Sequence, residues 1–137
     1  MKKAFYSFIF IIVFIFAYHD ANAQEIYKFR AKYVSFKEYN SYSGWKDWSE
    51  WDDINILIVI DTEDQRISIY AKETHTLDIY DSDYSEEGEK NILKFLSIDE
   101  DGIKCRARFI YYEDAEERQL YIDYSNFIVV YAVKPMR

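Results

Sequence analysis

The sequence predicts an all-β protein with a single domain of about eight antiparallel strands. Apolar and polar residues alternate along most of residues 24–133, and short polar turns separate the alternating segments. The composition, with 14 Tyr and 10 Phe but only 3 Gly and 1 Pro, also favours β-structure. Because short connections join neighbouring strands, we expect a meander that forms a small closed or partly open barrel. A two-layer β-sandwich is the alternative.

The first 23 residues have the pattern of a secretory signal peptide. Lys2 and Lys3 precede an apolar run over residues 4–18, and Ala21-Asn22-Ala23 has the small-x-small pattern of a cleavage site. We therefore expect residues 1–23 to be removed and residues 24–137 to form the β-domain. The domain would be periplasmic or secreted, with no transmembrane span. An uncleaved membrane anchor is the alternative. Gln24 stands where a lipoprotein needs cysteine, which argues against a lipid anchor.

Charge and cysteine content restrict the partners and the covalent chemistry. The net charge of −8 repels phosphate backbones, so we expect no nucleic-acid partner. Cys105 is the single cysteine, which excludes an intramolecular disulfide. We expect a buried, inert thiol, with pairing between two chains as the alternative.

The first predicted strand covers residues 24–39. Its apolar parity switches at Val34 and Phe36, which predicts a bulge or bend there. Before the switch, one face carries Tyr27, Phe29, Ala31 and Tyr33. Residues 54–60 and 65–72 then form the clearest hairpin. In the first strand, which is apolar on both faces, Ile54, Ile56, Ile58 and Ile60 share one face. In the second, the predicted inward side chains are Ile67, Ile69 and Ala71.

The middle of the chain gives weaker signals. Residues 75–80 predict a strand with Leu77 and Ile79 inward, and residues 81–89 predict an acidic loop. Residues 91–98 predict a strand that Lys94 interrupts. Its expected inward side chains are Ile92, Leu96 and Ile98. A single helical turn near residues 86–93 is the alternative for this stretch.

The C-terminal third predicts three strands, at residues 103–112, 118–124 and 127–133. Gly102 ends a hairpin turn that begins at Asp99. The inward side chains are expected to be Ile103, Cys105, Ala107, Phe109, Tyr111, Leu120, Ile122 and Tyr124. Lys104, Arg106 and Arg108 face outward, where Asp123 can form cross-strand ion pairs with them.

The candidate ligand-binding residues are Trp45, Trp48 and Trp51. In an extended segment this spacing places Trp45 and Trp51 on one face and Trp48 on the other. At least one indole should then lie in the core, and the exposed member could bind a sugar ring or an apolar ligand. The spacing resembles the tryptophan ladder of thrombospondin type 1 repeats, but those repeats need several disulfides and a matching arginine strand.

Catalytic chemistry has little support. His75 is the single histidine of residues 24–137, and no local motif supplies a nucleophile, a phosphate loop or a metal site. We therefore expect no enzymatic activity, cofactor or metal, and we interpret His75 as strand surface. A pocket that brings His75 together with two carboxylates would favour an enzyme instead.

Ile67-x-Ile69-Tyr70, Asp101-Gly102-x-x-Cys105 and Tyr121-Ile122-x-Tyr124 follow the tryptophan segment in order. In this order of features the chain resembles small exported β-proteins of gut-type, Bacteroidetes-like bacteria. The resemblance covers core and turn residues and implies no activity. The expected function is a non-enzymatic binding or interaction module for an envelope protein or a small apolar or sugar ligand. A structural or inhibitory partner protein is the alternative.

Overall fold

The computed structural model describes residues 26–136, so the predicted signal peptide lies outside the described residues. This part of the chain contains nine strands and no helix, which confirms the all-β prediction. It accordingly has no helix that could cross a membrane. The strands are β1 (Ile26–Asn40), β2 (Gly44–Trp45), β3 (Asp52–Asp61), β4 (Arg66–Tyr70), β5 (Thr74–Glu87), β6 (Lys90–Asp99), β7 (Lys104–Tyr112), β8 (Arg118–Asp123) and β9 (Phe127–Pro135).

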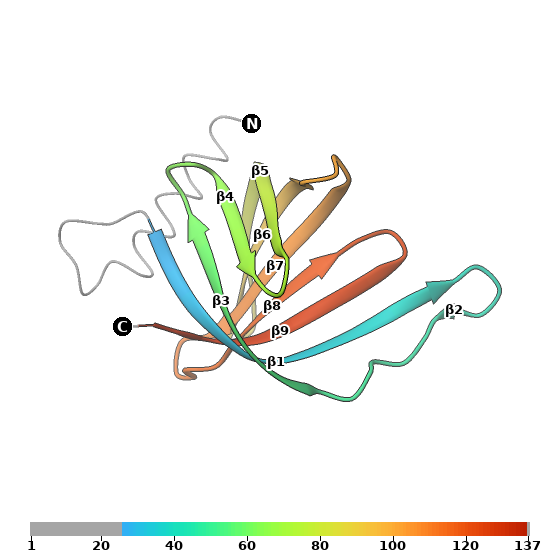
Figure 1. The fold of residues 1–137 in the computed structure, drawn as a ribbon. Helices are drawn as coiled ribbons and strands as arrows, with labels where there is room; N and C mark the ends of the chain where they lie inside the picture. Colours follow the sequence, from blue (N-terminus) through green and yellow to red (C-terminus); the bar gives the residue numbers. More distant parts are fainter. Residues whose placement is uncertain (1–25, 137) are drawn as a thin grey trace.

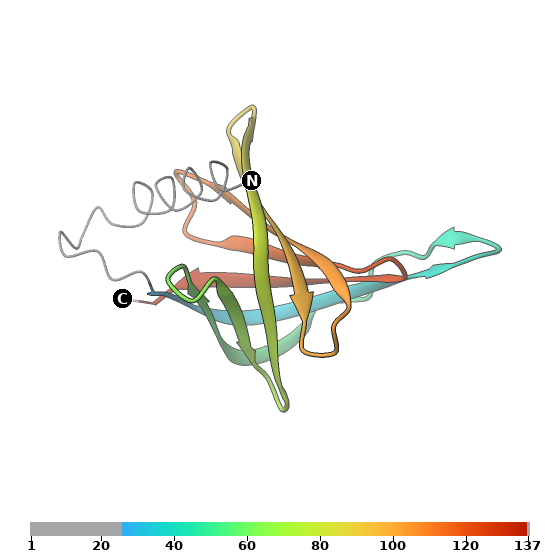
Figure 2. The same ribbon diagram turned by 90° about the horizontal axis from the view of Figure 1, so that it is seen from above.

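The strands form a closed antiparallel barrel rather than a sandwich (Figure 1). Eight strands follow in the order β1-β3-β4-β5-β6-β7-β8-β9, and β9 pairs back to β1 from Phe29↔Pro135 to Glu38↔Phe127. Closure leaves the barrel without free edge strands along most of its wall. The short β2 pairs only with the end of β1, and this hairpin projects from the barrel as an arm (Figure 2).

Apolar side chains from all eight strands form a core inside the barrel. Three phenylalanines are among the largest fully buried side chains: Phe29, Phe95 and Phe109. The rings of Phe29 and Phe109 lie 5.1 Å apart, at a tilt that suits aromatic packing. Cys105 belongs to the same buried core cluster, as predicted. Burial raises the pKa of this thiol to about 11, which keeps it protonated and unreactive at neutral pH.

A β-bulge in β1 decides which side chains enter the barrel. The register of β1 shifts between Ala31 and Tyr33 against both β3 and β9. Before the bulge, Phe29 and Ala31 point inward, as predicted, whereas Tyr33 is exposed after it. After the bulge, Phe36 pairs with Val129, and both lie on the inner side of the barrel. The predicted bulge is confirmed, and it lies between Ala31 and Tyr33, just before Val34.

The prediction for the inner face of β6 was wrong. Leu93 and Phe95 belong to the core, whereas Leu96 is 38% exposed. Strand residues two apart share a face, so Lys94 marks the face of Ile92, Leu96 and Ile98 as the outer one. Ile92 is still buried there, opposite Ile110 of β7. Lys94 therefore identifies the outer face rather than interrupting an inner one.

The predicted acidic loop at residues 81–89 is mostly strand. β5 continues to Glu87, after a bulge between Ile79 and Asp81, and pairs with β6 down to Glu87↔Lys90. Aspartate, serine and glutamate have low β-propensity, but pairing to β6 overrides it. The turn is confined to Gly88, whose φ of 65° suits glycine, and Glu89. The alternative of a helical turn at residues 86–93 is also wrong.

The predicted inner faces of β7 and β8 are confirmed except at Ile103. Cys105, Ala107, Phe109 and Tyr111 point inward, and Ile103 is the exception because it is exposed in the turn before β7. On the outer face, Arg106 and Arg108 both bind Asp123 of β8.

Candidate functional site

The barrel has a pocket of about 530 Å³ at one end, which we call the mouth pocket. It opens at the end of the barrel where the β4–β5 and β8–β9 turns lie. The lining residues come from β1, β4, β5, β8, β9 and the β8–β9 turn: Phe36, Glu38, Tyr39, Ile69, His75, Leu77, Ile122, Tyr124, Asn126, Phe127, Val129 and Tyr131. Most of these side chains are aromatic or aliphatic, and three are polar.

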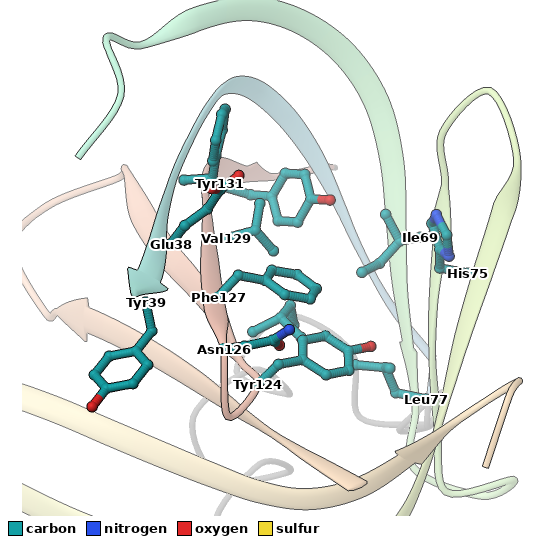
Figure 3. A pocket seen from close by; sticks show the side chains of 12 residues that line it. Glu38, Tyr39, Ile69, His75, Leu77, Tyr124, Asn126, Phe127, Val129 and Tyr131 are labelled. Carbon is teal, nitrogen blue, oxygen red and sulfur yellow. The ribbon is translucent and has the colours of Figure 1, made fainter. Parts of the chain in front are cut away.

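Two walls of different character face each other across the mouth pocket (Figure 3). Tyr124, Phe127 and Tyr131 present rings on one side, and Ile69, His75 and Leu77 lie on the other. Tyr39 points away from these side chains. The aromatic wall follows from strand parity, because Phe127, Val129 and Tyr131 alternate along β9 and share one face.

The β1 bulge adds Phe36 and Glu38 to this wall. Glu38 pairs in register with Phe127, and its side chain is exposed at the rim, beside Val129 and Tyr131. Without the extra residue at the bulge, the strand alternation would place Lys37 on the inner side instead. The bulge thus exchanges a lysine for a carboxylate and a phenylalanine at the mouth.

Tyr124 fixes the position of the aromatic wall. Its ring stacks on Phe127 at 4.5 Å with an interplanar angle of 17°. Its hydroxyl donates a 2.8 Å hydrogen bond to Asp99 Oδ2, while Asp99 Oδ1 accepts the amides of Asp101 and Ile103. The wall is therefore connected to the turn between β6 and β7.

The hydrogen bonds at this turn also set the charge state of Asp99. Burial alone would raise its pKa, but the bonds from the Ile103 amide, the Tyr124 hydroxyl and the Asp101 amide lower the pKa below its usual value. Burial and the bond to Asp99 in turn raise the pKa of Tyr124. At neutral pH the Asp99 carboxylate is therefore ionised and accepts a hydrogen bond from the protonated Tyr124 hydroxyl.

His75 lies on the opposite wall and is oriented by Glu100. Its Nδ1 lies 2.7 Å from Glu100 Oε1, and Glu100 Oε2 accepts the Thr76 amide at 3.2 Å. Burial would raise the pKa of Glu100, but hydrogen bonds from backbone amides and from His75 lower it. The sequence predicted His75 as plain strand surface. Its side chain is half-exposed, yet it lines the mouth pocket.

Within residues 26–136, Glu100 is the one carboxylate at hydrogen-bond distance from the His75 side chain. Glu38, the carboxylate that lines the mouth pocket, lies on the opposite side from His75 (Figure 3). An enzyme would be favoured by two carboxylates that converge on His75. Within the described residues, Glu100 supplies one such carboxylate and Glu38 does not supply the second. Among residues 26–136, no group of three or more His, Cys, Asp or Glu side chains could hold a metal ion.

The three tryptophans lie on the outer surface and not in the mouth pocket. All three are 40–49% exposed, so the expectation that one lies in the core was wrong. Trp45 and Trp48 both face Lys37, whose Nζ lies 5.4 and 4.8 Å from their ring centroids. The predicted split of these two rings between opposite faces is therefore also wrong.

Residues 46–51 of the tryptophan segment are not a strand, and hydrogen bonds to β1 hold them in an irregular path. Ser49 holds them there: its amide donates to the Phe36 carbonyl, and its carbonyl accepts the buried Ser35 hydroxyl at 2.7 Å. The ring of Trp48 then contacts Tyr121 of β8, at 6.0 Å between centroids. Because the segment is not a strand after Trp45, alternation does not apply to it.

We call this surface the outer patch; its members are Lys37, Trp45, Trp48, Tyr121 and Arg108. Arg108 extends it by stacking 4.4 Å above the Tyr121 ring and binding Asp123. Tyr39, which lines the mouth pocket, contacts Trp45 of the patch, with the ring centroids 5.4 Å apart.

Comparison with known proteins adds no further assignment. No protein-family model, curated protein or solved structure matches the chain.

Proposed function

We propose that this protein is an exported, non-enzymatic binding module whose mouth pocket takes up one small, largely apolar ligand. One observation carries the proposal, namely a pocket of about 530 Å³ with aromatic and aliphatic walls and a few polar groups at its rim. Ligand sites of soluble proteins have this size and this composition. Barrels of eight strands also have room for a single small ligand when side chains do not fill them.

Export is part of the proposal and rests on the N-terminal sequence. Lys2, Lys3, the apolar run and Ala21-Asn22-Ala23 support cleavage after Ala23. An exported barrel could carry or capture a ligand outside the cytoplasm, in the periplasm or in the medium. The mass of the protein recovered from outside the cytoplasm tests this part directly, because cleavage leaves Gln24 as the first residue.

Titration with the neutral fluorescent probe N-phenyl-1-naphthylamine tests the binding site. We expect saturable binding by the wild-type protein and loss of binding in Val129→Trp, because the larger side chain fills the pocket from β9. Val59→Trp is the matched control, since Val59 is a partly buried valine of β3 that does not line the pocket. Equal binding by Val129→Trp would place the ligand elsewhere, and no binding by the wild type would refute the proposal.

A second candidate function is a partner protein of the cell envelope, acting through the outer patch and the arm. The observation that favours it is the exposure of Trp45, Trp48 and Trp51 on one segment, because aromatic residues are enriched in protein interfaces. Light scattering during size exclusion, together with a pull-down from envelope extracts, separates the two functions. A strictly monomeric protein with no captured partner would argue against this second function.

A further inference from the structure

We infer that the ligand of the mouth pocket is a cationic amphiphile, with an apolar body and a protonated or quaternary amine at one end. This inference rests on the proposed function, since it specifies the ligand of the same pocket. It follows from the charges at the rim and from the aromatic wall.

The first step concerns the charges that line the pocket. Glu38 is the one acidic residue of the lining, and none of the described lining residues is lysine or arginine. Two further carboxylates contact lining residues: Asp99 accepts a hydrogen bond from Tyr124, and Glu100 lies at hydrogen-bond distance from His75. Hydrogen bonds lower the pKa of both carboxylates, so both are ionised at neutral pH. Any positive charge on His75 would be balanced by its direct contact with Glu100.

The second step concerns two cations, Lys37 and Arg108, whose contacts hold them in the outer patch and outside the pocket lining. Lys37 precedes Glu38 in the chain, but its ammonium lies over the rings of Trp45 and Trp48 in the outer patch. Arg108 binds Asp123 and stacks on Tyr121 in the same patch. An anionic head group, such as the carboxylate of a fatty acid, would therefore meet Glu38 with no lysine or arginine among the described lining residues to compensate its charge.

The third step is the match between the aromatic wall and a cation. The rings of Phe127 and Tyr131 lie beside the rim position of Glu38, and an ammonium group gains energy over such ring faces. A carboxylate at the edge of an aromatic wall adds a direct charge partner. The net charge of −8 also draws cations towards the protein from a distance.

Displacement of N-phenyl-1-naphthylamine by three ligands with the same ten-carbon chain tests the inference. The ligands are decyltrimethylammonium, decanol and decanoate, each used as separate molecules below the concentration at which it aggregates. We expect the cation to displace the probe at concentrations about 5–30-fold lower than decanol, and decanoate to be the weakest. The ratio between cation and alcohol is the quantity measured, so the neutral alcohol serves as the internal reference.

Variants of Glu38 locate the effect. Glu38→Gln should reduce the ratio but leave the part that the aromatic wall contributes, and Glu38→Lys should shift the preference towards decanoate. Glu63→Gln is the matched control, because Glu63 is an exposed glutamate in the turn at the opposite end of the barrel. Raising the salt concentration should also lower the preference for the cation.

The outcomes are distinguishable from those that test the proposed function. A probe that binds and is displaced best by decanol or decanoate would overturn the inference and leave the proposed function intact. A preference for the cation that persists in Glu38→Lys would overturn the role of Glu38. A probe that does not bind the wild type at all would overturn the proposed function itself.

Discussion

Aromatic side chains gather at two places in this protein, the mouth pocket inside the barrel and the outer patch on its wall. In the outer patch, Lys37 lies over Trp45 and Trp48, and Arg108 lies over Tyr121. The two indoles are exposed and Tyr121 is partly buried, yet the protein's own cations already cover one face of each ring. In the mouth pocket, the rings of Phe127 and Tyr131 border an open volume with no lysine or arginine among its described lining residues.

The difference shows that exposure of an aromatic ring is a poor indicator of a binding site. The outer patch is the more conspicuous feature, because its rings come from one short segment of sequence. Its aromatic surface stabilises the contact between β1, β8 and the segment after β2. The rings of the mouth pocket come from several strands, so no short aromatic motif in the sequence marks it. The pocket is concave, however, and a concave site allows a ligand to bury most of its surface.

The largest expected effect is a loss of stability from a substitution that disrupts the ion pairs beside the outer patch and leaves the mouth pocket intact. Asp123 is 9% exposed and accepts hydrogen bonds from Arg106 and from Arg108, at 2.9 and 2.6 Å. Asp123→Asn removes the charge that these two guanidinium groups share, so we expect the free energy of unfolding to fall by about 2 kcal/mol. Urea unfolding measures the loss, and titration of N-phenyl-1-naphthylamine should give an unchanged affinity.

The matched control for this prediction is Asp64→Asn, since Asp64 is an exposed aspartate in the turn between β3 and β4. This variant should unfold like the wild type. If Asp123→Asn weakened probe binding as strongly as it lowers stability, the two regions would not be independent, and the comparison between them would fail.

A pair of ring deletions compares the two regions directly. Phe127→Ala removes the ring that stacks on Tyr124 and part of the pocket wall, so we expect the affinity for the probe to fall about tenfold. Trp48→Ala removes the contact with Tyr121 and the ring beneath Lys37, and should leave the affinity unchanged. The opposite result, with binding lost in Trp48→Ala alone, would restore the tryptophans as the ligand site.

The sequence predicts the fold well where one face of a strand is charged. In β7, Arg106 and Arg108 mark the outer face without ambiguity, and the inner residues follow. In β6, apolar residues occupy both faces, so only Lys94 carries the information, and the inner face was assigned wrongly. The second half of β5 is strand because it pairs with β6, and that pairing is not visible in the local sequence.

The candidate site is less predictable than the fold for a related reason. The mouth pocket combines side chains from Phe36 to Tyr131, which are brought together only by barrel closure and by the β1 bulge. Strand alternation predicted Ile69, Leu77, Ile122 and Tyr124 inward, and the parity switch in β1 was the signal for Phe36, but neither predicts that these side chains leave a pocket between them. The tryptophan prediction failed because Ser35 and Ser49 hold that segment in an irregular path, where strand alternation has no meaning.

The smallest expected effect is a change in how much stability the protein loses at acid pH, which we attribute to carboxylates at the mouth and not to the outer patch. The pKa values of Asp99 and Glu100 are lowered in the folded protein, so the stability that these carboxylates contribute is fully present above their unfolded pKa values. It is lost as the pH falls below about 4 and through the lower folded values. Tyr124→Phe removes one of the hydrogen bonds that lower the pKa of Asp99.

This variant should therefore lose less stability than the wild type between pH 7 and pH 3, by less than about 1 kcal/mol. Urea unfolding at the two pH values measures the difference. Tyr42→Phe is the control, because Tyr42 is 98% exposed in the arm and should keep the acid sensitivity of the wild type. An equal acid loss in Tyr124→Phe and the wild type would mean that the bond between Tyr124 and Asp99 does not hold the mouth. The acid sensitivity would then arise from other carboxylates, such as Glu100 beside His75.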